Sequence, residues 1–446
     1  MIRDILLHLL DLTYVIGGKE SQYSIFKEYK KSEYDSKDKI NESVVNKLNL
    51  IVKHAYDNVP IYKRLYENVG INAGSIDSTD DLHHLPILDK SIIRHNFPDN
   101  TIDANLKARA MYNTTSGSTG EPLEFYNDRL AEPYRTASFM FFNSWMGVKP
   151  FDKHWNLKSV GNYSLKQKTW FWLVQKHFHH VFDVKKESIP AILNEINELK
   201  PSYIEGYSGS LVKLTRYLDE LGLGLDFDLK AIIATSENLL NSRRDLMEKV
   251  FDCKVYNRYG SREFCGALAQ ECSESEGLHI NPYLCYIEIV DDNGEPVDEG
   301  ESGKILVTDL HNFVMPFIRY EIGDVGVKGS NDNSCGRNFQ TIKSIVGREG
   351  EFIISSKGEK IPFVTISAYL FRRLYPPYVY SYQFVQEERG EILLKIIPTP
   401  RITEDIINEM HNTLQTLLPT FTVELQVVDD IPVGKSGKTP FIKTVT

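Results

Sequence analysis

The sequence predicts an α/β protein with a large N-terminal domain, residues 1–346, and a small C-terminal domain, residues 347–446. In residues 201–234 a strand pattern, a turn, a helix and a second apolar strand follow one another. Such alternation is typical of a parallel sheet that binds ligands at the C-terminal ends of its strands. After Gly347 the pattern changes to a hairpin with mixed helices and strands. We therefore expect mixed and parallel β-sheets flanked by helices in the large domain, and a small mobile α+β lid domain after it.

The other elements follow from apolar spacing and turn residues, taken in chain order. Apolar residues spaced three and four apart predict helices, and short apolar runs between turn residues predict strands. In the large domain the expected elements are helices over residues 40–69, 130–146 and 188–199, a helix ending at Leu221, and a strand over 231–234. In the lid they are a hairpin over 352–362, helices over 365–374 and 404–418, and strands over 378–385, 392–397 and 423–428.

Residues 1–16 are apolar enough to resemble a signal peptide or an anchor. Asp4 and Asp11 interrupt this segment, and the apolar region of a signal peptide would not carry carboxylates. Its apolar residues fall on one helical face, which predicts an amphipathic helix docked on the protein, with membrane-surface contact as the alternative. No segment elsewhere in the sequence is long and apolar enough to span a bilayer.

Composition indicates an ordinary globular protein. The 446 residues are 41% apolar and 25% charged, and their net charge of -10 argues against a general nucleic-acid surface. Five cysteines in so long a chain form no compact disulfide framework, so we expect a reducing compartment and a cytoplasmic location.

Residues 112–122, YNTTSGSTGEP, combine hydroxyls and glycines with almost no bulk. Glycines let the backbone approach a phosphate, and successive N–H groups and hydroxyls donate to it. A flexible surface turn is the alternative, since the run lacks the lysine of the common NTPase loop. The predicted phosphate-binding residues are Thr115, Ser116, Gly117, Ser118, Thr119 and Gly120.

Four further motifs follow this loop. They are VYNRYGSRE at residues 255–263, FIRYEIGD at 317–324, IVGREGEF at 345–352 and PVGKSGK at 432–438. With the phosphate loop they give the chain a resemblance to the adenylate-forming, AMP-binding superfamily of acyl-CoA synthetases. Within it the chain resembles the branch of phenylacetate-coenzyme A ligase and its relatives in capsular polysaccharide gene clusters.

The resemblance implies a role for each motif. The loop would hold the pyrophosphate end of ATP, Glu263 would help to hold Mg²⁺, and Asp324 would accept from both ribose hydroxyls. Arg348 would lie near the ribose and phosphates, and Gly350 stands at the hinge before the lid. The remaining nucleotide-binding residues implied are Ser236, Glu237, Asn257, Tyr259 and Gly260.

Lys438 in the last motif is the predicted catalytic cation, together with Glu263 as the metal-binding carboxylate. A carboxylate that attacks the α-phosphorus of ATP brings two anions together, and a fixed positive charge lowers their repulsion in the transition state. Lys438 would bridge the acyl oxygen and the α-phosphate. A solvated, mobile C-terminal tail is the alternative for this segment taken alone.

Cys272, His279 and Cys335 resemble a structural zinc set found in several relatives. Asn333 replaces a further cysteine of that pattern, so a fourth ligand would have to come from Cys265 or elsewhere. Separate thiols and a surface histidine are the alternative.

The predicted function is that of an AMP-forming ligase using ATP and Mg²⁺. It would adenylate a small carboxylic acid, release pyrophosphate and transfer the acyl group to coenzyme A. Residues 357–362 depart from the hairpin common in coenzyme A ligases, which leaves an amine, amino acid or sugar acceptor in polysaccharide biosynthesis as an alternative. An inactive scaffold in that pathway is the second alternative. We also expect a homodimer.

Overall fold

The computed structural model describes residues 20–71, 76–115, 122–161, 163–274, 276–330, 333–434 and 436–444. The chain divides into two compact units. Unit 1 contains the described residues within 1–150 and 258–345, and unit 2 contains those within 151–257 and 346–446. The helix expected in residues 1–16 lies outside the described residues.

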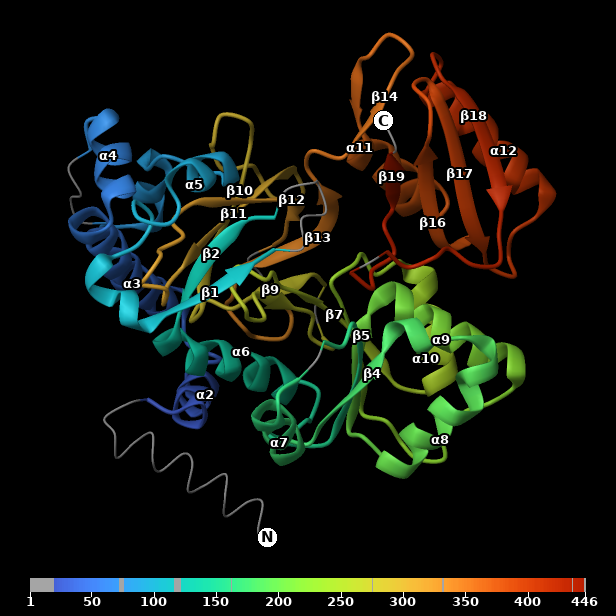
Figure 1. Cartoon of the computed structure of the whole chain (residues 1–446), viewed down its shortest axis with the longest axis horizontal. Helices are drawn as coiled ribbons and strands as arrows, with labels where there is room; N and C mark the ends of the chain where they lie inside the picture. Colours follow the sequence, from blue (N-terminus) through green and yellow to red (C-terminus); the bar gives the residue numbers. More distant parts are fainter. Residues whose placement is uncertain are drawn as a thin grey trace. The chain divides into compact units, whose positions relative to one another are not determined.

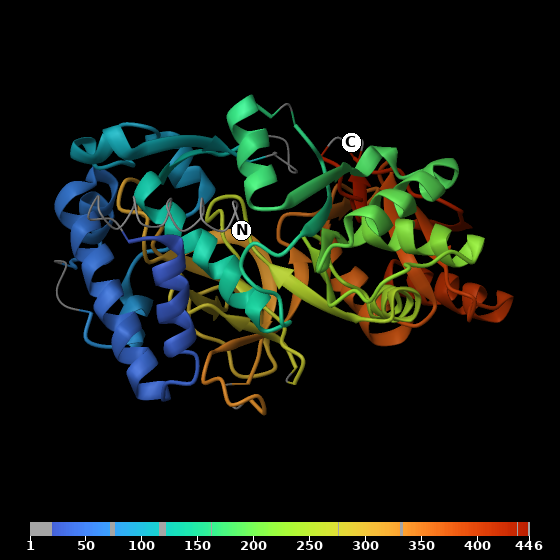
Figure 2. The same ribbon diagram turned by 90° about the horizontal axis from the view of Figure 1, so that it is seen from below.

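Unit 1 combines helices with a largely antiparallel sheet (Figure 1). Its helices are α2 (Gln22–Lys31), α3 (Lys37–Asn58), α4 (Pro60–Asn68), α5 (Lys90–Asn96) and α6 (Glu132–Ser144), with 3-10 turns η1 (Thr79–His84), η2 (Ala104–Arg109) and η3 (Arg129–Ala131). Its strands are β1 (Ala110–Thr114), β2 (Glu124–Asp128), β8 (Ala269–Gln270), β9 (Leu278–Ile280), β10 (Cys285–Val290), β11 (Ser302–Asp309), β12 (Tyr320–Lys328) and β13 (Thr341–Arg348), the last of which ends in unit 2. Helix α2 lies along α6 (Figure 2).

Two helices stand where the sequence predicts one over residues 40–69. Ser36 caps α3 by accepting from the backbone N–H of Lys39, and α3 ends before Val59. Pro60 then occupies the first turn of α4, where its missing N–H leaves no helical hydrogen bond unmade. The residue before a proline avoids the helical region, and Val59 is extended with φ -116° and ψ 111°. The helical expectation is therefore correct in type but divided at this proline.

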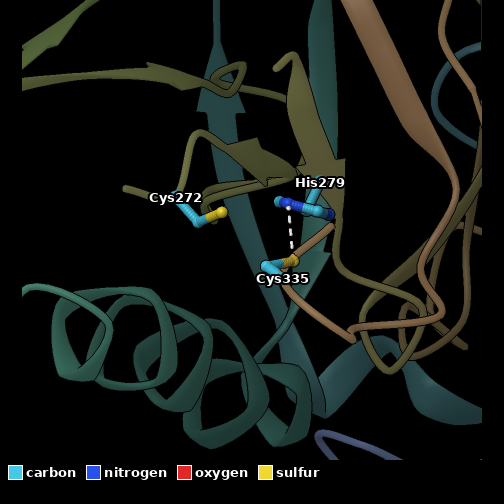
Figure 3. Close-up of side chains that lie close together, drawn as sticks. All are labelled: Cys272, His279 and Cys335. Atoms are coloured by element: carbon cyan, nitrogen blue, oxygen red, sulfur yellow. Dashed lines mark hydrogen bonds between the residues drawn. The ribbon is translucent and has the colours of Figure 1, made fainter. Parts of the chain in front are cut away.

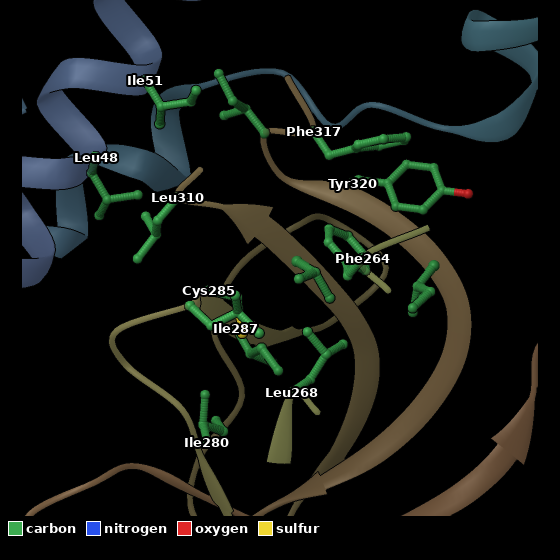
Figure 4. Close-up of a cluster of buried hydrophobic side chains, with 14 of the residues drawn as sticks. Leu48, Ile51, Phe264, Leu268, Ile280, Cys285, Ile287, Leu310, Phe317 and Tyr320 are labelled. Atoms are coloured by element: carbon green, nitrogen blue, oxygen red, sulfur yellow. The ribbon is translucent and has the colours of Figure 1, made fainter. Parts of the chain in front are cut away.

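The core of unit 1 joins α3 to the strands and loops that carry two of the predicted motifs. Leu48 and Ile51 from α3 are fully buried in the same cluster as Phe264, Phe317 and Tyr320 (Figure 4). The Phe317 ring lies 5.6 Å from that of Phe264 and 4.9 Å from that of Tyr320. Aromatic pairs at such distances add to the burial energy. This packing fixes the backbone beside Glu263.

Unit 2 begins with alternating strands and helices. Its elements up to residue 259 are β3 (His154–Lys158), α7 (Leu165–Leu173), β4 (Lys176–His180), η4 (Val181–Asp183), η5 (Lys186–Ser188), α8 (Ile189–Leu199), β5 (Tyr203–Tyr207), α9 (Ser208–Leu221), β6 (Ala231–Thr235), α10 (Asn241–Phe251) and β7 (Lys254–Tyr259), which crosses into unit 1. Strand β3 pairs in parallel with β4 and β5, and β5 pairs in parallel with β6. The parallel sheet expected from residues 201–234 is therefore present.

The C-terminal part of unit 2 forms a second, four-stranded sheet in the order β18-β17-β16-β19, with α12 against β18 (Figure 1). Its elements are β14 (Phe352–Ile354), β15 (Lys360–Pro362), α11 (Phe363–Ala368), the π-helix η6 (Tyr369–Leu374), β16 (Val379–Gln386), β17 (Glu391–Pro398), α12 (Glu404–Leu417), β18 (Thr422–Val427) and β19 (Ile442–Thr444). The expected hairpin, strands and amphipathic helix are confirmed to within about two residues. The helix expected over 365–374 begins at Phe363 and ends as a π-helix.

The α/β fold predicted from the sequence is confirmed. Parallel strands flanked by helices, antiparallel strands and a small α+β sheet are all present. The division into residues 1–346 and a mobile lid from 347 stays a prediction, because unit 2 contains residues 151–257 together with 346–446.

Candidate active site

The predicted phosphate loop connects the two strands of a hairpin. Strands β1 and β2 pair antiparallel, with Thr114 opposite Glu124. Thr115 continues the ladder, because its N–H donates to the Leu123 carbonyl and its hydroxyl accepts from the Leu123 N–H, both at 2.9 Å. Residues 116–121 of the loop lie outside the described residues. Thr115 is therefore held at the base of the loop.

Glu263 and Asp324 are nearly buried carboxylates of unit 1, 6% and 8% exposed. Each accepts from a tyrosine hydroxyl. Tyr259 at the end of β7 donates to Asp324 Oδ2 at 2.8 Å, and Tyr320 at the start of β12 donates to Glu263 Oε1 at 3.4 Å. A carboxylate has several lone pairs, and a hydroxyl that donates to one of its oxygens fixes the orientation of the group. The two tyrosine hydroxyls therefore orient both of the carboxylates that the sequence predicts as binding residues.

The backbone around these carboxylates is tightly turned. Gly323 has φ +84°, and a Cβ there would lie 3.0 Å from Lys90 Nζ. A Cβ at Gly260 would lie 2.6 Å from the Gly266 carbonyl oxygen, so the turn that precedes Glu263 accepts no side chain at this position. The local backbone therefore explains why glycine stands at both of these motif positions.

Lys90 lies beside the motif that ends at Asp324. Its ammonium donates to the Ile322 carbonyl at 2.9 Å, one residue before Gly323. Leu88 forms a parallel bridge with Tyr320, and the backbone bonds on either side of it hold the segment against β12. A lysine at residue 90 thus stands beside the Asp324 motif, which sequence separation alone does not reveal.

Lys438 lies in unit 2, against the end of a parallel strand. Its ammonium is 5.8 Å from the centroid of the Tyr207 ring, and Tyr207 is the last residue of β5. Gly437 has φ +81°, and a Cβ there would meet Val181 Cγ2 at 2.7 Å and the Tyr207 ring at 3.4 Å. The C-terminal segment therefore approaches the C-terminal edge of the sheet as closely as a glycine allows, and this edge is where parallel α/β sheets bind ligands.

Glu237 follows β6 at the same edge, and its side chain is 3% exposed. Its two oxygens accept from backbone N–H groups on different segments: Oε1 from Thr439 at 2.7 Å and Oε2 from Gly209 at 2.6 Å. Burial raises the pKa of this carboxyl, while the charge of Arg243 and the two backbone donors lower it. Glu237 thus links the residue after Lys438 to the first turn of α9.

The other predicted site residues have less defined surroundings. Ser236 is exposed with φ +68°, Asn257 is half-buried in β7, and Arg348 is exposed at the end of β13. Gly350 has φ +84°, and a Cβ there would meet nothing within 4 Å. Their nucleotide-binding roles and the hinge at Gly350 stay predictions.

Cys272, His279 and Cys335 lie together in unit 1 (Figure 3). All three are buried, and one ligand atom from each lies within 4.8 Å of the others, with Cys335 Sγ 3.6 Å from His279 Nε2. Burial, followed by the charge of Arg337, lowers the pKa of His279 to about 4, so the imidazole is neutral at pH 7 and can act as a ligand.

Cys265, one candidate for a fourth ligand, does not belong to this group. Its thiol donates to the Arg262 carbonyl at 3.0 Å and accepts from the Asn127 amide. The Asn333 amide, which stands in place of a cysteine, donates to the carbonyls of Arg337 and Phe339. Among the described residues the group therefore contains three ligands.

No helix within the described residues is long and apolar enough to cross a membrane.

The chain is similar to several known proteins. Residues 353–444 match the family of the CapK C-terminal domain. Protein CapK of Staphylococcus aureus is 26% identical over 372 residues, which are 81% of this chain and 80% of CapK. Phenylacetate-coenzyme A ligase of Thermus thermophilus is 23% identical over 375 residues, 80% of each chain. The structure of 2-hydroxyisobutyryl-CoA ligase in its postadenylation state superposes with a TM-score of 0.72 at 19% identity, covering 92% of this chain and 91% of the ligase.

The fold of this chain is therefore that of the acyl-CoA ligase structures. Among proteins of known name, the chain is similar to Protein CapK and to phenylacetate-coenzyme A ligase, and its residues 353–444 match the CapK C-terminal domain.

Proposed function

We propose that the protein is an ATP-dependent, AMP-forming ligase that activates a small carboxylic acid and transfers the acyl group to coenzyme A. The observation that carries this proposal is the position of Lys438. A lysine near the end of the chain lies beside Tyr207, at the C-terminal edge of a parallel sheet that begins far earlier in the sequence. A merely solvated tail has no reason to place a cation at a ligand-binding edge.

The carboxylates of unit 1 supply the complementary functions. Asp324, oriented by Tyr259, is suited to accept hydrogen bonds from the two hydroxyls of a ribose. Glu263 is suited to hold Mg²⁺ together with phosphate oxygens, since hard cations prefer oxygen ligands. Bound Mg²⁺ would neutralise charge on the pyrophosphate leaving group. The residues of the loop that begins at Thr115 would donate to the same phosphates.

The first step forms a bond between a carboxylate oxygen of the acid and the α-phosphorus of ATP. The bond from that phosphorus to the bridging oxygen breaks, and pyrophosphate leaves with the electron pair. Lys438 would stabilise the negative charge that gathers on the acyl and α-phosphate oxygens in the transition state. In the second step a thiol attacks the acyl carbon, the thiol proton is lost to solvent or a base, and AMP leaves.

Exchange of labelled pyrophosphate into ATP, measured with a panel of carboxylic acids, tests the first step. We expect acid-dependent exchange that falls by about 10²- to 10³-fold in Lys438→Ala, as for loss of one electrostatic stabiliser. Lys443→Ala, which removes an exposed lysine from the neighbouring strand β19, is the matched control and should exchange like the wild type. Equal exchange in Lys438→Ala and wild type would remove the catalytic assignment, and no exchange with any acid would favour the inactive scaffold.

The acceptor of the second step has one specific alternative. The similarity to CapK, and the departure of residues 357–362 from the hairpin of coenzyme A ligases, make amide or ester formation on a sugar or amino acid in polysaccharide biosynthesis the alternative. Incubating the acid and ATP with coenzyme A, amino acids and amino sugars, and identifying the products by mass spectrometry, separates the two. A thioester supports the main proposal, and an amide or ester formed in preference to it replaces that proposal.

We also propose that Cys272, His279 and Cys335 bind zinc. Zinc lies about 2.3 Å from sulfur and about 2.0 Å from nitrogen in tetrahedral sites, so its ligands stand roughly 3.5 Å apart. The 3.6 Å between Cys335 Sγ and His279 Nε2 fits this spacing. Metal analysis of the purified protein should give about one zinc per chain, and Cys335→Ser should lose it. Cys253→Ser, at a half-buried thiol of unit 2, is the control. Equal zinc content in Cys335→Ser and wild type would contradict the assignment.

We also propose that the protein is a homodimer in the cytoplasm. All five cysteines are among the described residues, and no disulfide joins them. Light scattering on the purified protein measures the oligomeric state.

A further inference from the structure

Glu237 and Arg243 hold the segment that carries Lys438 against the parallel sheet of unit 2. We infer that these two residues act as positioning residues for Lys438, and that neither makes its main contact with the nucleotide. This inference deepens the proposed function and rests on it. It also replaces the nucleotide-binding role that the sequence predicts for Glu237.

The contacts of Glu237 are the first step of the argument. Both oxygens are already engaged by backbone N–H groups, those of Thr439 and Gly209. Thr439 directly follows Lys438, so the bond at 2.7 Å fixes the backbone of the lysine itself. Gly209 is in the first turn of α9, where unpaired N–H groups and the helix dipole favour an anion. A carboxylate satisfied in this way has little capacity left for adenine.

Two glycines make this approach feasible. A Cβ at Gly209 would lie 2.5 Å from Glu237 Oε2 and 2.8 Å from the Thr439 hydroxyl. A Cβ at Gly437 would lie 2.7 Å from Val181 Cγ2. Both positions therefore need glycine if the carboxylate and the C-terminal segment are to meet at the start of α9.

Glu237 and Arg243 together form what we call the clamp, and Arg243 is its second half. Its guanidinium is fully buried and lies 3.7 Å from Glu237 Oε2. On one side it donates to the Ser208 hydroxyl at 3.1 Å, and on the other to the Tyr380 carbonyl at 2.6 Å and the Ser381 hydroxyl at 2.9 Å. Tyr380 and Ser381 belong to β16 of the C-terminal sheet. The fork of one arginine thus joins α9 and α10 to β16, which a lysine could not do with one ammonium group.

The energetics of this buried ion pair suit it to fixing a geometry rather than to adding stability. Burying two charges has a desolvation cost that offsets most of their attraction, so such pairs add little net stability while they specify one geometry. The raised pKa of the Glu237 carboxyl, due first to burial, agrees with that cost. A clamp of small net stability can also release, as a lid that serves two half-reactions requires.

The test uses Glu237→Gln in the full-length protein. Glutamine has the same shape, but its amide nitrogen would oppose one of the two N–H donors. We expect kcat for pyrophosphate exchange to fall on the order of 10- to 100-fold with KM for ATP unchanged, since a charge-assisted bond of the positioning group is lost. Amide hydrogen exchange at Thr439 should become at least about tenfold faster, because its acceptor is weakened. Arg243→Lys should show the same pattern.

Glu248→Gln is the matched control. Glu248 is also in α10, and it accepts from the Val255 N–H at 2.9 Å at the start of β7, not from the Lys438 segment. It should leave kcat and the exchange of Thr439 unchanged. A rise in KM for ATP in Glu237→Gln, with kcat and Thr439 exchange as in wild type, would overturn the inference and restore the nucleotide-binding role. If the wild type shows no pyrophosphate exchange, the proposed function fails, and the hydrogen-exchange measurement still decides whether the clamp exists.

Discussion

Gly437→Ala should disrupt the docked position of Lys438, which is its place beside Tyr207, and leave the rest of the fold intact. The native φ of +81° is strained for any residue with a Cβ, at about 1–2 kcal/mol. The added methyl group would also stand 2.7 Å from Val181 Cγ2 and 3.2 Å from Ser159 Cβ, and such overpacking costs about 1–3 kcal/mol. The sum is roughly 2–5 kcal/mol against the docked segment. At about 1.4 kcal/mol per tenfold, 3 kcal/mol lowers the ratio of docked to undocked protein by about two orders of magnitude.

The assay for Gly437→Ala is pyrophosphate exchange beside thermal unfolding. We expect kcat to fall about 100-fold, since only the docked population presents Lys438. The melting temperature should change little, because residue 437 lies between β18 and β19 and belongs to no helix or strand. Gly434→Ala is the control in the same loop: its φ is not positive, and its Cβ would lie at ordinary distances of 3.4 Å from the Lys438 carbonyl oxygen and 3.8 Å from Pro440. Near-wild-type kcat in a folded Gly437→Ala protein would refute the reasoning.

Two further predictions concern unit 1. Asp324→Asn should raise KM for ATP by about 10- to 100-fold, since hydrogen bonds to a charged acceptor are lost; an unchanged KM in steady-state kinetics would contradict the ribose assignment. Burial, followed by the charge of Lys47, lowers the pKa of His311 to about 3, against an ordinary value near 6.5. A lowered histidine pKa stabilises the folded state above pH 6.5, and this contribution is lost as pH falls toward 3, by about 2 kcal/mol at pH 5. In urea unfolding, the free energy of unfolding of the wild type should fall by about 2 kcal/mol more between pH 7.5 and pH 5 than that of His311→Gln. An equal pH dependence in both proteins would contradict this prediction.

Local elements of this protein are predictable from the sequence because their causes are local. The strand ending at Tyr207, the helix ending at Leu221 and the hairpin turn at Gly358 each have a periodicity or a turn residue within a few positions. The division of the helix at Pro60 is also a local effect, and the sequence carried its signal. The motif residues could be found in the same way, since Glu263 and Asp324 follow strands or turns.

Contacts between distant segments are not predictable in this way. The partner of Glu237 is the backbone of Thr439, about two hundred residues away, and a backbone N–H leaves no mark in the sequence. Arg243 lies in an amphipathic helix where its charge suggests solvent, yet it is fully buried. Lys90 reaches the Asp324 motif only because the segment at Leu88 bridges to Tyr320. Each of these depends on how elements pack.

One sequence signal does point to the clamp once the geometry is known. Glycine at the first turn of a helix, as at Gly209, weakens helix propensity, and glycine at residue 437 stands directly before the predicted catalytic lysine. Neither is needed for the helix or the strand itself. Gly209 is needed because a Cβ there would collide with the Glu237 carboxylate and the Thr439 hydroxyl, and Gly437 is needed because of its positive φ and its closeness to Val181. A substitution of Gly209 by alanine should therefore resemble Glu237→Gln in its kinetics, with lower kcat and unchanged KM for ATP, although the helix would gain propensity. If Gly209→Ala instead exchanges pyrophosphate like the wild type, Glu237 does not need this close approach, and the clamp does not position Lys438.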